Sequence, residues 1–168
     1  MTLRVPRIES SALGGMHSDW LQQKHRELLS YVKDDLPGTE AVAYYGLDLN
    51  ELSKYKGAPG GFSVPSMQFD VPHIALHTHP DCLTFSAGDL DRFMLSDNMR
   101  LITAVGNDGS LYYMEKTAKF DFVEAYRDYR YAIDMSPDYK DSPEKYSEFI
   151  DSYLTSQGNV GIIYGKLR

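Results

Sequence analysis

A short apolar run that ends in two histidines constrains the fold of this chain more than any other stretch. Residues 73–76 (His-Ile-Ala-Leu) indicate a β-strand, and His77-Thr78-His79-Pro80 follows them directly. In a strand, side chains two positions apart point to the same face, so His77 and His79 project together. The separation of the two imidazoles then suits a single metal ion.

A second motif, Ser86-x-x-Asp89, follows after a short loop, at the start of a pattern typical of a helix. From this position the Asp89 carboxylate can fold back toward both imidazoles. Two neutral imidazole nitrogens and one carboxylate leave the fourth position of a tetrahedral zinc ion open, which is typical of a catalytic zinc site. The sequence therefore predicts a Zn²⁺ site made by His77, His79 and Asp89.

The same Ser86-x-x-Asp89 spacing is also typical of a capping box, in which each residue satisfies a backbone N–H at the start of a helix. Taken alone, the motif is more often a cap, and a histidine pair on a strand is more often bound to another partner or exposed. The two motifs together are much rarer than either one and favour a metal site. Asp89 discriminates between the interpretations, because we do not expect a capping carboxylate to have quite the geometry of a ligand.

Length, composition and charge exclude several classes of protein. The 168 residues suit one domain, and 42% of them are hydrophobic, which is enough to form a core. The net charge of −7 and the absence of a Lys/Arg cluster argue against nucleic-acid binding. The only cysteine, Cys82, can form no intrachain disulfide, and no apolar run could span a membrane. We expect a soluble cytoplasmic protein, and no feature of the sequence selects an oligomeric state.

Hydrophobic periodicity predicts a small mixed sheet flanked by helices, an α+β fold. Helices are expected over residues 17–32, 86–95, 120–133 and 142–154, and strands over 40–47, 74–79, 100–105, 111–114 and 160–164. Residues 62–69, which Pro65 interrupts, are expected to form a short edge strand or an irregular element. Residues 1–16 are predicted to be an irregular lead-in, and residues 50–61 a polar connection. Residues 120–168 form a C-terminal helical extension that ends in a short strand.

The histidine and serine–aspartate motifs resemble the JAMM (JAB1/MPN+) zinc metalloprotease motif: a glutamate, then His-x-His, seven residues, and Ser-x-x-Asp. Here the gap, residues 80–85, has six residues, a shortening similar to that of bacterial and phage-associated JAB-type domains. The resemblance covers residues 38–116. It implies the three-layer architecture of MPN and cytidine-deaminase-like folds. It also implies a Zn²⁺-dependent peptidase or isopeptidase that acts on a peptide or a ubiquitin-like protein.

The resemblance further implies a role for each motif residue. The two histidines and the aspartate hold zinc, while Ser86 donates a hydrogen bond to the oxyanion formed from the amide. A glutamate on a neighbouring strand acts as general base and then as general acid. Glu40, which opens the strand over residues 40–47, is the better match for this glutamate, and Glu51 in the polar connection is the competitor.

Other catalytic chemistries lack their residues in this chain. A nucleobase deaminase needs a Pro-Cys-x-x-Cys motif and a His-x-Glu motif, and the sequence has one cysteine and His77-x-His79 instead. The His-Glu-x-x-His motif of another class of zinc metalloproteases is absent. A thiol enzyme centred on Cys82 is disfavoured, because its loop position suggests an ordinary residue. A non-catalytic JAB-like scaffold or partner-binding module remains the alternative, although such members of the family usually lose one or more ligands.

Overall fold

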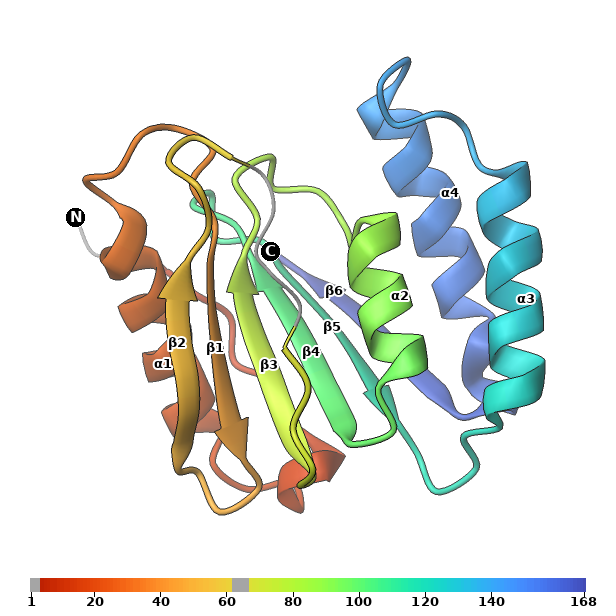
Figure 1. The fold of residues 1–168 in the computed structure, drawn as a ribbon, viewed down its shortest axis with the longest axis horizontal. Helices are drawn as coiled ribbons and strands as arrows, with labels where there is room; N and C mark the ends of the chain where they lie inside the picture. The colour runs from red at the N-terminus through yellow and green to blue at the C-terminus, as the bar shows by residue number, and fades with distance from the viewer. Residues whose placement is uncertain (1–3, 62–66) are drawn as a thin grey trace.

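A six-stranded mixed sheet with helices on both faces forms the framework of the computed structural model, which describes residues 4–61 and 67–168 (Figure 1). The strands are β1 (Ala41–Gly46), β2 (Glu51–Lys56), β3 (His73–Thr78), β4 (Met99–Val105), β5 (Leu111–Lys116) and β6 (Ile162–Leu167). The helices are α1 (Ser18–Val32), α2 (Ala87–Leu95), α3 (Phe122–Met135) and α4 (Pro143–Thr155), with 3-10 turns η1 (Ser11–Leu13) and η2 (Gln157–Val160). The predicted α+β fold is confirmed.

The strand order is β2-β1-β3-β4-β5-β6, in which only the β3–β4 pair is parallel. Helix α1 covers one face of this sheet, and α2 and α4 lie on the other face with α3 packed against α2 (Figure 1). Each face therefore has its own apolar core. Leu21 and Leu28 of α1 belong to the first core, and Leu90 and Phe93 of α2 belong to the second.

Strand β3 is buried on both faces, so its alternate side chains enter different cores. Ile74 and Leu76 pack on the α1 side, and Ala75 packs on the α2 side. His77 has the same parity as Ala75 and therefore faces α2. The histidine motif thus comes to lie between the end of β3 and the first turn of α2.

The register of β1 against β3 brings the start of β1 beside the histidine motif. Val42 pairs with His77, and beyond the end of the ladder the Ala41 N–H donates to Thr78 Oγ1 at 3.0 Å. Glu40 precedes β1, and its carbonyl accepts the Gly57 N–H at 2.8 Å, which continues the β1–β2 pairing by one residue. Glu40 therefore lies at the same end of the sheet as the histidines, on the face that Val42 shares with His77.

Three of the sequence predictions need correction or limitation. Residues 50–61 were expected to be a polar connection but contain β2, an edge strand whose exposed polar side chains give no hydrophobic alternation. The lead-in 1–16 is not merely irregular, because Val5, Ile8 and Leu13 enter the α1-side core. Of the strand predicted over 62–69, residues 62–66 lie outside the described residues, and residues 67–69 form no strand.

The remaining predicted helices and strands are confirmed within a few residues at their ends. The C-terminal strand is part of the main sheet, where β6 pairs antiparallel with β5 and forms the second edge. Within the described part of the chain, no helix combines the length and apolar character that crossing a membrane requires.

His25, which is buried between α1 and the sheet, makes the stability of the fold depend on pH. His25 of α1 is fully buried, its Nε2 lies 2.7 Å from Thr103 Oγ1, and burial lowers the pKa of His25 to about 3, with a smaller contribution from the charge of His77. Below about pH 6.5 the unfolded chain therefore binds a proton at His25, whereas folded His25 stays neutral until the pH approaches 3. Stability from this residue is fully present above pH 6.5 and is lost as the pH falls toward 3.

As the pH is lowered from 6 to 4, we predict that the free energy of unfolding of the wild type decreases by ~1.4 kcal/mol per pH unit more than that of His25→Gln. Urea denaturation of both proteins across this range measures the difference. His17→Asn, a change at an exposed histidine, is the control and should keep the wild-type slope. A difference between wild type and His25→Gln that stays constant with pH would contradict the prediction.

Candidate metal centre

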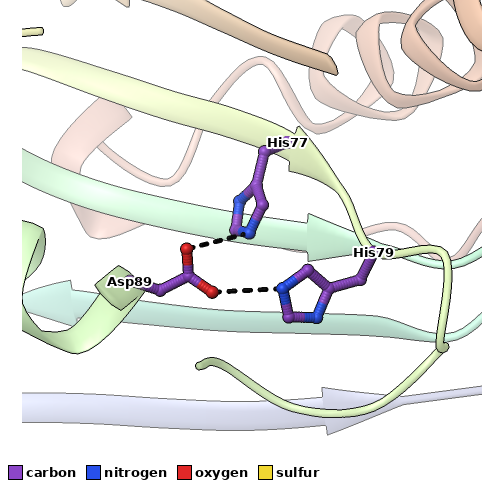
Figure 2. A group of neighbouring side chains, drawn as sticks. All are labelled: His77, His79 and Asp89. Atoms are coloured by element: carbon purple, nitrogen blue, oxygen red, sulfur yellow. Dashed lines mark hydrogen bonds and ion pairs between the residues drawn. The ribbon is translucent and has the colours of Figure 1, made fainter. Parts of the chain in front are cut away.

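His77, His79 and Asp89 converge in a buried group where β3 ends and α2 begins (Figure 2), and we call these three residues the His–His–Asp cluster. One ligand atom from each residue lies within 4.8 Å of the others. The Asp89 Oδ1 atom is 3.4 Å from His77 Nε2, and Asp89 Oδ2 is 3.1 Å from His79 Nε2. The structure therefore brings together the three residues that the sequence proposed as metal ligands.

The His79 ring is oriented by the loop that follows it. His79 Nδ1 lies 2.7 Å from the Leu83 carbonyl oxygen. Because a carbonyl can only accept, Nδ1 carries the proton in this pair, and Nε2 is the atom that faces Asp89. A ligating histidine is commonly held in this way, with its second ring nitrogen donating to a backbone carbonyl.

The His77 ring leaves one nitrogen for a ligand. His77 Nε2 is buried and makes no hydrogen bond of good geometry to any described residue, although Asp89 is close by. A buried nitrogen without a hydrogen bond is costly, and a coordinated cation would satisfy it. The donor set of two imidazole nitrogens and one carboxylate is typical of a zinc site with an open position. The residues therefore fit a single metal ion.

Asp89 serves both the helix and the cluster. Its Oδ2 accepts the Ser86 N–H at 2.9 Å, and Ser86 Oγ accepts the Asp89 N–H at 3.2 Å, which completes a capping box at the start of α2. Asp89 thus caps the helix while it faces both imidazoles. A carboxylate has two oxygens with several lone pairs, and Asp89 Oδ1 faces His77 while Oδ2 caps the helix and faces His79.

The charges of the cluster are strongly coupled. Burial alone would raise the pKa of Asp89, but the interactions with His77 and His79 outweigh it and hold the pKa well below its usual range. Burial alone would lower the pKa of His79, yet the hydrogen bond and charge of Asp89 dominate and raise it to about 9. The cluster therefore favours an anionic carboxylate beside a cation, whether that cation is a proton on imidazole or a metal ion.

Glu40 lies within electrostatic range of the cluster. The residue is 7% exposed, and burial raises the pKa of its carboxyl to about 8, with opposing effects from His79 and Asp89. The competitor Glu51 instead begins β2, opposite Tyr45 at the far end of β1, and is exposed. The structure places Glu40, and not Glu51, beside the candidate metal centre.

Arg92 is a neighbour of the cluster that the sequence analysis did not single out. Its Nη1 lies 3.7 Å from Asp89 Oδ1, its side chain is 19% exposed, and its charge acts on Glu40. Arg92 follows Asp89 by three residues on α2, so the i,i+3 spacing of opposite charges on a helix was the available signal. The guanidinium adds positive charge to the wall of the site.

The loop between the ligands, residues 80–85, is held by segments distant in the sequence. The Tyr112 hydroxyl of β5 donates to the Cys82 carbonyl at 3.0 Å, and the Tyr146 hydroxyl of α4 donates to the Phe85 carbonyl at 3.1 Å. No local pattern in the sequence indicates these contacts. They anchor the short loop at two points between His79 and Asp89, which fixes the spacing of the ligands.

Neither models of protein families, nor curated proteins, nor solved structures match this chain. The assignment of a candidate metal centre therefore depends on the geometry of the cluster and on the motif that the sequence contains. Together they support a group of residues that could hold a metal ion in a mixed α/β fold.

We predict that purified protein incubated with zinc binds about one ion per chain, and that Asp89→Asn binds zinc at least tenfold more weakly. Asparagine keeps an oxygen that can accept the Ser86 N–H, so the helix cap survives while the charged ligand is removed. Elemental analysis and a zinc titration measure the effect, with the exposed Asp97→Asn as control. Equal zinc affinity in wild type and Asp89→Asn would refute the site.

Ser86→Ala tests the cap separately from the metal. We expect the variant to lose about 1 kcal/mol of unfolding free energy because the Asp89 N–H loses its acceptor, and to retain zinc because Ser86 is not a ligand. Chemical denaturation and the same zinc titration provide the two measurements. Loss of zinc from Ser86→Ala without further structural change would show that the cap and the site cannot be separated.

Proposed function

We propose that this chain is a zinc-dependent amide hydrolase, a metallopeptidase or isopeptidase of the JAMM type. The observation that carries the proposal is the buried His–His–Asp cluster with the Glu40 carboxyl beside it. Ionisable groups are costly to bury, and a concentration of them at the end of a sheet is characteristic of a functional site. The order of the motif residues along the chain resembles the JAMM motif and supports the same conclusion.

His77, His79 and Asp89 would hold the zinc ion through the atoms that already face one another. When bound, zinc supplies Lewis acidity that polarises the amide carbonyl and lowers the pKa of water toward neutrality. With zinc bound, the Leu83 carbonyl would still accept from His79 Nδ1, which leaves Nε2 for coordination.

Glu40 is the proposed general base and acid. Its carboxylate would accept a proton from the attacking water and pass that proton to the nitrogen of the leaving amine. Its place directly before the start of β1, on the face it shares with His77, supports this role. The backbone pairing of Glu40 with Gly57 keeps the side chain on that face.

Ser86 is the proposed donor to the developing oxyanion of the amide. Its Oγ accepts the Asp89 N–H, which leaves its own O–H available, and the residue is exposed at the start of α2. A hydroxyl can accept and donate at the same time, so capping and oxyanion stabilisation are compatible. The proposed substrate is a peptide or a ubiquitin-like protein, as the JAMM resemblance implies. The single cysteine supports the proposal of a cytoplasmic setting.

We predict that Glu40→Gln retains zinc but hydrolyses its substrate at least a hundredfold more slowly, because glutamine cannot accept a proton. The assay is a panel of peptide amides and ubiquitin-like isopeptide conjugates presented to the zinc-loaded protein. Glu51→Gln is the matched control and should keep wild-type activity, since Glu51 lies at the far end of β1.

Wild-type rates in Glu40→Gln would reject Glu40 as the general base. A wild-type protein that binds zinc stoichiometrically and hydrolyses no member of the panel would instead favour a non-catalytic JAB-like scaffold. Zinc analysis of every variant keeps these two outcomes apart.

A further inference from the structure

A cavity of about 590 Å³ lies on the α1 side of the sheet, and we call it the α1 cavity. It is bounded by the C-terminal half of α1, the segment 35–39 that follows this helix, and the end of β3. The volume is typical of sites for small molecules. The cavity lies on the opposite side of the sheet from His77 and Asp89, which face α2, although His79 of the cluster also lines it.

The charged groups of the α1 cavity leave positive charge uncompensated. Arg26 and Lys33 both line it, and neither makes an ion pair with any described residue. Arg26 Nε is buried and has no hydrogen-bond partner within residues 4–61 and 67–168. Asp35, the acidic residue of the lining, is already paired with Lys56 at 2.7 Å. In a chain of net charge −7, this arrangement indicates an anionic ligand.

The remaining wall of the cavity is largely apolar. Leu29 and Val32 of α1 lie on one side, and Val5 and Val105 complete the lining from the lead-in and β4. A small inorganic anion would leave these side chains without a partner, whereas an organic anion with a hydrocarbon body would contact them. The forked guanidinium of arginine matches a carboxylate geometrically.

We propose that the α1 cavity binds a small amphiphilic carboxylate, with its carboxylate at Arg26 and Lys33 and its hydrocarbon body against Leu29, Val32 and Val105. This proposal does not depend on the proposed hydrolase function. The two sites nevertheless meet at one end of the sheet, because His79 and Thr39, the residue before Glu40, also line the cavity. A bound carboxylate would therefore lie next to two segments that position the metal centre.

Octanoate is the probe for this site, with octan-1-ol and octylammonium as neutral and cationic controls of equal chain length. We expect octanoate to bind saturably and to shift the backbone amide resonances of the C-terminal half of α1, Thr39 and His79 in a two-dimensional ¹H–¹⁵N titration. Octan-1-ol should bind at least about tenfold more weakly, because it forms no charge-assisted hydrogen bond. Octylammonium should bind more weakly still.

Two charge variants locate the carboxylate. Arg26→Gln and Lys33→Gln should each weaken octanoate about tenfold and leave octan-1-ol unchanged, while Lys145→Gln, an exposed change on α4, should alter neither. Ser30→Trp keeps the charges but fills the mouth of the cavity, and it should block both ligands. This variant and Lys33→Gln test the proposal even if Arg26→Gln fails to fold.

The proposal is overturned by equal affinity for octanoate and octan-1-ol, by resonance shifts confined to other surfaces, or by no shift at millimolar octanoate. Unchanged octanoate binding in both Lys33→Gln and Ser30→Trp would also overturn it. The titrations require neither zinc nor hydrolytic activity, so failure of the proposed function leaves them interpretable.

Discussion

The arrangement of the site depends on the hydrogen bonds and ion pairs that the buried Asp89 carboxylate makes. A buried carboxylate is costly unless it is paired and hydrogen-bonded, and Asp89 is satisfied by the Ser86 N–H, both cluster histidines and Arg92. These partners come from the end of β3, the following loop and α2. The capping box fixes where α2 begins, and Leu90 and Phe93 in the same helix bury its apolar face. Helix packing and ligand position are therefore determined by the same turn.

The C-terminal part of the chain completes the site from outside the motif. Helix α4 holds the loop 80–85 through Tyr146, and the Tyr139 hydroxyl in the segment before α4 donates to Asp81 Oδ2 at 2.5 Å. The loop is one residue shorter than in the JAMM pattern, yet it still brings His79 and Asp89 together. A short loop has fewer conformations to lose, and tyrosine hydroxyls from outside the loop hold it in place.

Local patterns were sufficient to predict the centre of the site. The two-residue period of a strand places His77 and His79 together, and the Ser86-x-x-Asp89 spacing identifies the start of α2. Edge strand β2 was missed because its side chains are exposed and polar, so that its backbone pairing with β1 alone defines it. The bracing of the loop by α4 could not be predicted either, because it joins residues some sixty positions apart, and hydroxyl-to-carbonyl hydrogen bonds leave no periodic signal.

Comparison with the other buried histidines of this chain shows how the surroundings of His77 differ from those of histidines that have only neutral partners. His25 and His73 are buried as completely as His77, and each also has one ring nitrogen without a hydrogen bond to a described residue. An unpartnered nitrogen is therefore not distinctive by itself. Burial lowers the pKa of both His25 and His73, and each has a neutral partner, a threonine hydroxyl or a backbone carbonyl. His77 instead faces a buried carboxylate, beside a second imidazole.

A fold that needed only packing at this position would gain stability from apolar side chains of similar volume. The sheet accepts such side chains one residue away, since Leu76 is fully buried on the opposite face. Glu40, directly before β1, is a second example. Burial raises the pKa of its carboxyl to about 8, whereas the pairing with β2 uses only its backbone carbonyl. The concentration of ionisable side chains at one end of the sheet thus carries a desolvation cost that apolar side chains would avoid, which is the physical reason to treat that end of the molecule as a candidate functional site.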